Sequence, residues 1–178
     1  YEMVKSPIFK EFGQTLIQDQ TGEIGMHLHA WNTPPIDPLT LDDYYYQPFL
    51  VEYRQDIMEE KIKVMTELLE DNFNTKIISH RSGRWTLNKK YTDLLIKHGY
   101  KLDCSVTPLR SWKNTKGTPD GEGGSDYTFY PNYSYWIENS DSYSKKLLLE
   151  IPLTIISKKA WVNYMANTKF FKNNIIRK

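Results

Sequence analysis

The clearest pattern in the sequence is a repeat of apolar positions every three or four residues between residues 56 and 73. This period places apolar side chains along one side of an α-helix, so the stretch predicts a helix with one buried face. The stripe contains Met58, Ile62, Met65 and Leu69, and it is widened by Ile57, Val64 and Leu68.

Residues 88–98 have the same period and predict a second helix. Gly99 follows directly, and glycine commonly ends helices because it adopts the left-handed conformation without strain. The side chains expected to face inward are Tyr91, Leu94 and Leu95.

A helix is also expected near the start of the chain, because Ser6 provides a capping hydroxyl and Pro7 suits the first helical position. Gly22 would end this helix. A helix is further expected from residue 160 to about residue 173. In the first helix, the apolar positions at helical spacing are Phe9, Phe12 and Leu16.

Four short apolar runs predict β-strands, at residues 23–28, 76–80, 102–105 and 148–155. Strands and helices alternate through residue 106, which is typical of βα units around a parallel sheet. Residues 107–146 are rich in Gly, Ser, Asn, Asp and Tyr, and we expect a long structured excursion there. The pattern predicts one α/β domain over residues 1–178, with a mainly parallel sheet and helices outside it.

Composition narrows the function only slightly. The net charge is +1, which argues against a nucleic-acid partner. No apolar run approaches about 18 residues, so no membrane span is expected. A single cysteine, Cys104, excludes an internal disulfide, which fits a cytoplasmic protein and equally a disulfide-free protein of the cell envelope. Aromatic residues make up 14% of the chain, a content that suits the apolar faces of sugars but also suits a core.

The first candidate site is the pair His27 and His29, two residues apart in a predicted strand. Alternate residues of a strand share a face, so both imidazoles should point the same way and could bind one divalent ion such as Zn²⁺. The alternative is a pair of structural histidines held by hydrogen bonds. Trp31 begins the loop after this strand, and the sequence offers no obvious third metal ligand nearby.

The second candidate is the segment from Ser79 to Trp85, which follows a buried strand. Gly83 allows a tight or left-handed turn. Arg81 and Arg84 carry planar guanidinium groups that can bind a carboxylate through two hydrogen bonds, although arginines are more often solvated. Trp85 could stack on a sugar or belong to the core.

Asp103, near the end of the third predicted strand, could pair with Arg81 and fix its orientation. The alternative for Asp103 is a turn or helix cap. The neighbouring Cys104 has no basic neighbour in the sequence that would lower its pKa, so an unreactive thiol is expected.

Together these segments resemble the polysaccharide deacetylase superfamily, also called the NodB-homology or carbohydrate esterase 4 group. The segment Glu23-Ile24-Gly25-Met26-His27 resembles its metal motif, the loop around Arg81 its arginine motif, and the segment from Gly99 to Val106 its following aspartate motif. The branch named after the lipopolysaccharide-biosynthesis protein WalW is the most similar, through residues 27–31, the Pro34-Pro35 pair and residues 81–85.

The resemblance implies a distorted (β/α) barrel with a metal-binding site at the carboxyl ends of its strands. It implies metal-dependent removal of acetyl groups from a polysaccharide or lipopolysaccharide-type glycan. His27 matches the first metal histidine. The second histidine of the family falls four residues later, where this chain has Trp31, so His29 is a substitute by position. Arg81 and Asp103 would belong to the catalytic site, and Trp31, Arg84 and Trp85 would bind substrate.

Two parts of the family pattern are absent from the sequence: the aspartate motif that supplies the base, and a late histidine that acts as acid, since no histidine follows His98. We therefore interpret the chain as an internal part of a longer domain. Two alternatives are a catalytically inactive carbohydrate-binding domain of the same fold, and a structural domain whose aromatic residues contact a protein partner.

Overall fold

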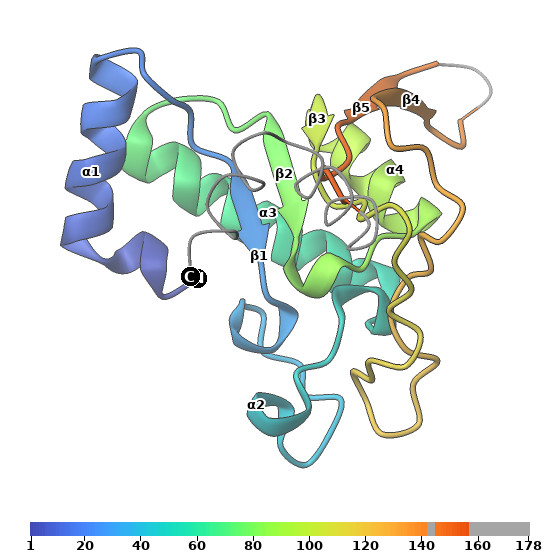
Figure 1. The fold of residues 1–178 in the computed structure, drawn as a ribbon. Helices are drawn as coiled ribbons and strands as arrows, with labels where there is room; N and C mark the ends of the chain where they lie inside the picture. Colours follow the sequence, from blue (N-terminus) through green and yellow to red (C-terminus); the bar gives the residue numbers. More distant parts are fainter. Residues whose placement is uncertain (142–144, 157–178) are drawn as a thin grey trace, which may run out of the picture.

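The computed structural model describes residues 1–141 and 145–156, and these form a sheet with helices packed against it (Figure 1). In the described residues the sheet has five strands in the order β1-β2-β3-β5-β4. Four of them run parallel, and β4 is antiparallel to β5 at one edge. The strands are β1 Met26–Leu28, β2 Ser79–Ser82, β3 Leu102–Asp103, β4 Tyr135–Glu138 and β5 Leu147–Glu150.

The prediction of an α/β fold with a mainly parallel sheet is confirmed. The described part of the sheet is open, with β1 and β4 at its two edges. All four predicted strands are present, but each is shorter than expected, and β2 also begins three residues later and ends two residues later than predicted. The predicted helix at residues 160–173 lies outside the described part of the chain.

The helices connect successive strands, as expected for βα units. Helix α3 follows β1 and helix α4 follows β2, and they contact each other and the same side of the sheet (Figure 1). Helix α1 packs on α3. No helix in the described residues combines the length and apolar character needed to cross a membrane. The α-helices are α1 Pro7–Gln18, α2 Asp43–Tyr46, α3 Gln55–Phe73 and α4 Lys89–Lys97; the 3₁₀ turns are η1 Met3–Lys5, η2 Ala30–Asn32, η3 Leu50–Glu52 and η4 Gly83–Trp85.

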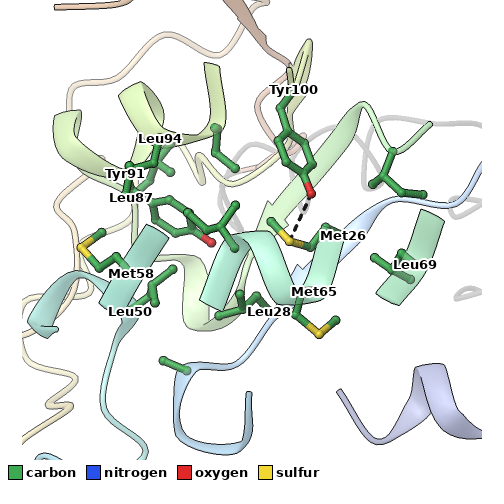
Figure 2. Packing of buried hydrophobic residues seen from close by; sticks show 14 of the residues in the cluster. Met26, Leu28, Leu50, Met58, Met65, Leu69, Leu87, Tyr91, Leu94 and Tyr100 are labelled. Atoms are coloured by element: carbon green, nitrogen blue, oxygen red, sulfur yellow. Dashed lines mark hydrogen bonds between the residues drawn. The ribbon is translucent and has the colours of Figure 1, made fainter. Parts of the chain in front are cut away.

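The core lies between the sheet and helices α3 and α4 (Figure 2). The apolar stripe predicted for α3 is buried, as are the three inward positions predicted for α4. Figure 2 shows Met58, Met65, Leu69, Tyr91 and Leu94 around Met26 and Leu28 of β1. The hydroxyl of Tyr100 donates to the sulfur of Met26 at 3.3 Å and also contacts Thr66 Oγ1 at 2.7 Å. Sheet and helix are therefore joined by both apolar packing and buried hydrogen bonds.

Helix α1 begins at Pro7 as predicted, but one detail of the prediction is wrong. Ser6 makes no side-chain capping bond. Phe12 is 59% exposed, because the buried face of the helix passes through Gly13 instead. A Cβ on Gly13 would lie 2.4 Å from Phe73, so the absence of a side chain lets α1 approach α3 closely.

The strand β4 was not expected, because the sequence analysis assigned residues 107–146 to an irregular excursion. Its Tyr135 and Ile137 are half-buried, whereas Trp136 between them is 60% exposed, which is the alternation of an edge strand. A period of two over only four residues is a weak signal within a segment rich in Gly and Ser. The pairing with β5 therefore decides that these residues form a strand.

Candidate functional site

His27 and His29 lie on the face of the sheet opposite to α3 and α4. Met26 and Leu28 are buried on the helix side, so the alternation of β1 turns His27 the other way, and His29 continues in extended backbone directly after the strand. The two imidazoles meet edge to face with centroids 4.7 Å apart, and their Nε2 atoms are 3.0 Å apart. The structure therefore brings the two predicted ligands together at the carboxyl end of β1.

The hydrogen bonds of the pair define the protonation of its nitrogens. His27 Nδ1 donates to the carbonyl oxygen of Arg81 at 2.8 Å, which leaves Nε2 of His27 as an acceptor. His29 Nε2 donates to that atom, and His29 Nδ1 is buried without a partner among the described residues. Burial lowers the pKa of His27, and burial together with His27 lowers the pKa of His29 to about 4. Both rings are therefore neutral at pH 7.

This arrangement fits two of the ligands of a zinc ion. Two nitrogens bound to one tetrahedral Zn²⁺ are roughly 3.3 Å apart, given Zn–N distances near 2.0–2.1 Å. The Nε2 atoms of His27 and His29 would have to separate only slightly from their 3.0 Å distance. The bond from His27 Nδ1 to a backbone carbonyl is the support that metal-binding histidines commonly have. Across residues 1–141 and 145–156, however, no cluster of three or more His, Cys, Asp or Glu could hold a metal.

Arg81 lies beside this pair. It is in register with His27 on the adjacent strand β2, and its exposed side chain lies on the same face of the sheet. Its guanidinium lies over the ring of Trp85, 5.2 Å from the centroid. Trp31 lies on the other side, edge to face with His29 at 4.5 Å. The structure therefore gathers His27, His29, Trp31, Arg81 and Trp85, five of the seven residues predicted for the site.

The side chain of Arg84 is not free to bind a substrate beside these five residues, because its guanidinium is already bound to other parts of the chain. Its guanidinium donates to the carbonyl oxygens of Tyr46 at 3.4 Å, Lys116 at 2.7 Å and Gln47, and it lies 4.2 Å from the ring centroid of Phe49. These contacts join three separate loops. A structural role therefore accounts for the guanidinium of Arg84.

Gly83 is needed for a different reason from the one expected. The residues with left-handed backbone are Arg84 and Trp85, with φ of 56° and 61°, and not Gly83. A Cβ on Gly83 would lie only 2.2 Å from the carbonyl oxygen of Leu28 and 3.2 Å from Nδ1 of His29. Glycine therefore allows the turn after β2 to pass directly against the histidine pair.

The expected pairing of Asp103 with Arg81 is wrong. Asp103 is fully buried on the opposite face of the sheet, and its Oδ1 accepts a 2.5 Å hydrogen bond from Nδ1 of His80. Strand register explains the difference, because Asp103 is aligned with His80, while Arg81 is one residue further and faces the other side. Asp103 therefore belongs to the core and cannot contact a ligand bound beside Arg81.

The sequence analysis missed the buried network to which Asp103 belongs. The hydroxyl of Tyr91 shares a 2.8 Å hydrogen bond with Nε2 of His80, and the hydroxyl of Ser105 donates to Asp103 at 2.8 Å. Burial alone would raise the pKa of Asp103, but the hydrogen bonds from His80 and Ser105 outweigh it and lower the pKa. A histidine and a carboxylate in register on neighbouring strands is the signal that could have revealed this pair.

Glu150 is the second carboxyl group of this network. It is fully buried beside Asp103 in the sheet register, and its Oε1 accepts from the backbone N–H of Val106 at 3.0 Å. Burial and the adjacent Asp103 raise the pKa of Glu150 to about 10. Glu150 is therefore a neutral acid at pH 7. Its position in an apolar strand of three leucines was visible in the sequence but was not interpreted.

Cys104 lies on the open face next to Arg81 and is half-buried. Burial raises the pKa of its thiol, with a further contribution from Asp103. At pH 7 the group is therefore a thiol, the unreactive form that the sequence predicts.

Fold and site together define an α/β protein with a mainly parallel sheet and a histidine pair at a strand end. No protein-family model matches the sequence, and no curated protein matches it. Among solved structures, the chain is similar to a protein from Mycobacterium smegmatis described as a polysaccharide deacetylase, with a TM-score of 0.49 and 15% sequence identity. The match covers 83% of this chain and 36% of that chain, so this chain spans little more than a third of its length.

Proposed function

We propose that this chain carries the metal-binding part of a hydrolase that removes acetyl groups from a polysaccharide or lipopolysaccharide-type glycan. The observation that carries the proposal is the 3.0 Å approach of the Nε2 atoms of His27 and His29 on an accessible face of the sheet. Two neutral imidazoles so placed can bind one divalent ion, most naturally Zn²⁺. The resemblance of the segments around His27 and Arg81 to deacetylase motifs supports the same function.

Each of the gathered residues would have a distinct part. His27 and His29 would hold the ion through Nε2, with the proton of His29 moved from Nε2 to the unpartnered Nδ1, and the backbone carbonyl of Arg81 would keep the ring of His27 oriented. A bound divalent ion supplies Lewis-acid chemistry, polarising a carbonyl and lowering the pKa of a bound water. The exposed guanidinium of Arg81 would position a carboxylate beside the reacting group. Trp31 and Trp85 would offer aromatic faces to sugar rings.

Zinc binding tests the proposal most simply. Titration calorimetry on the 178-residue chain should show one zinc per molecule, and His27→Ala or His29→Ala should weaken the affinity at least about tenfold, since each removes a ligand. His98→Ala is the matched control, because His98 contacts Glu59 on the helix side of the sheet and not the site. Equal zinc affinity in all three variants would rule out this site.

Acetate release tests the activity itself. The complete protein, loaded with zinc, should release acetate from an acetylated glycan such as a chitin oligosaccharide, and His27→Ala should abolish the release. Full activity of zinc-loaded His27→Ala would contradict the proposal.

A second function is favoured by one observation: the described residues contribute only two side chains to the metal. A carbohydrate-binding domain of the same fold, without hydrolysis, needs no complete metal site. Under this alternative the complete protein would bind glycan equally well with and without a chelator, and would release no acetate. Under the hydrolase proposal acetate release requires the metal.

A further inference from the structure

A buried lysine lies directly beneath the loop that carries His29 and Trp31. Lys61 is on the apolar face of α3, where its neighbours one turn away are Met58 and Met65, and it is only 1% exposed. Lysine is almost never fully buried without a partner, since removing an ammonium group from water is costly. The position of Lys61 therefore needs a specific reason.

The ammonium group is held by three backbone carbonyls of one loop. Nζ of Lys61 donates to Ala30 O at 3.0 Å, to Thr33 O at 2.7 Å and to Pro35 O at 2.6 Å. Three N–H donors thus meet three acceptors, so every N–H of the ammonium group has a backbone partner. The ring of Tyr53 lies 4.8 Å from Nζ and adds a favourable contact with the cation.

The loop fixed in this way determines where His29 lies. His27 is held by the pairing of β1 with β2, but His29 follows the last residue of β1 and has no strand partner. Its backbone carbonyl accepts a 2.8 Å hydrogen bond from Thr33 Oγ1, and Ala30 next to it is held by Lys61. The position of the His29 ring against His27 therefore depends on the path of residues 30–35.

We infer that Lys61 is a positioning residue for the histidine pair, which fixes the loop after β1 so that His29 and Trp31 face the same point as His27. The inference rests on the proposed function only in assigning a metal to the pair. A single cation that binds three carbonyls of one loop fixes that loop at three points, which a neutral side chain of the same length cannot do. Lys61 touches neither the metal position nor a substrate, so it acts only through the loop.

The test replaces Lys61 with methionine, which keeps the length and apolar stem of the side chain but removes the three donors. Hydrogen exchange of the metal-free protein should show amides of residues 30–33 and 36–37 exchanging at least about tenfold faster. Zinc affinity should fall at least about tenfold, because His29 no longer stays beside His27. Lys63→Met is the matched control, since Lys63 lies two residues away on the exposed side of the same helix. It should leave both quantities within about twofold of wild type.

Lys61→Gln keeps two N–H donors and should give an intermediate change in both measurements, which also provides a test if Lys61→Met does not fold. Loop exchange in Lys61→Gln equal to that in Lys63→Met would overturn the inference. Faster loop exchange with unchanged zinc affinity would overturn the positioning role as well. If wild type binds no zinc, the proposed function fails, and Lys61 is then tested by loop exchange alone.

Discussion

Asp103 and Glu150 are two carboxyl groups side by side in the core, and their surroundings give them different protonation states. Asp103 has three hydrogen-bond donors around it, from His80 and from the hydroxyl and backbone of Ser105. Glu150 has one donor, from Val106, and its Oε2 has none in the described structure. The charge therefore resides on Asp103, and Glu150 keeps its proton.

This difference predicts a pH-dependent stability that Glu150→Gln should remove. The folded state raises the pKa of Glu150 to about 10, so the folded protein binds this proton more tightly than the unfolded chain. The stability is therefore complete below the ordinary glutamate pKa and is lost as the pH rises toward 10, by at most about 1.4 kcal/mol per pH unit. Glutamine stays neutral and can still accept from Val106 and donate to Asp103. We expect the stability of Glu150→Gln relative to wild type to increase by about 2 kcal/mol from pH 6 to pH 8, measured by urea unfolding.

Glu138→Gln is the control for this experiment, because Glu138 lies on the neighbouring strand β4 with its side chain 59% exposed. Its unfolding curves should follow those of wild type at every pH. A constant difference between Glu150→Gln and wild type across the pH range would show that Glu150 is ionised in the fold.

Arg81 contributes to the candidate site through two separable groups. Its backbone carbonyl holds His27, and its side chain extends over Trp85. Arg81→Ala keeps the carbonyl, so zinc affinity should stay within about threefold of wild type. Turnover of the complete protein should fall roughly 10²-fold, as expected for a lost positioning group. Kinetics with Arg110→Ala, an exposed arginine of the later loop, provide the control. Unchanged turnover in Arg81→Ala would remove its side chain from the mechanism.

At the scale of elements, the turn after β2 controls how closely β2 and the histidine segment approach. Gly83→Ala would place a methyl group 2.2 Å from the carbonyl oxygen of Leu28, so the two segments must separate. We expect a loss of about 1–3 kcal/mol in the free energy of unfolding, together with weaker zinc binding, since His29 is displaced. Gly22→Ala is the control, because a Cβ there meets only Leu16 at 3.6 Å. Equal thermal stability of the two variants would contradict the close packing described.

The elements themselves were largely predictable from the sequence, because helix periodicity records which side is buried. The stripe of α3 and the inward side of α4 follow from spacing alone. Helix α1 was predicted in the right place, but a period of apolar residues cannot reveal that Gly13 is the contact point with Phe73. Strand β4 was missed because an edge strand of four residues acquires its structure from pairing with β5.

At the scale of the whole molecule, strand register divides the candidate residues between two faces. One row crosses the entire described sheet on the helix side: Met26, His80, Asp103, Glu150 and Tyr135. The next row, with His27 beside Arg81, lies on the open face. Sequence alone placed His27 and Arg81 at neighbouring strand ends. It could not assign Asp103 to the helix face, because a shift of one residue in register reverses the face of every side chain.

The roles of Arg84 and Lys61 also could not be predicted from the sequence, because they too depend on contacts that form only in the folded chain. The local sequence around Arg84 suggested a ligand-binding arginine, but its partners are carbonyls of residues 46, 47 and 116, far away in the chain. Lys61 is not singled out by the sequence pattern, and only the folded loop shows why it is buried. Residues whose roles depend on distant backbone groups cannot be identified from local spacing.

The most direct test of the central claim is a crystal structure of the zinc-loaded protein with anomalous diffraction collected at the zinc edge. The account predicts one strong anomalous peak about 2.0–2.1 Å from Nε2 of both His27 and His29, with Nδ1 of His27 still bonded to the carbonyl of Arg81. A peak bound elsewhere, or no peak at this pair in crystals saturated with zinc, would contradict it.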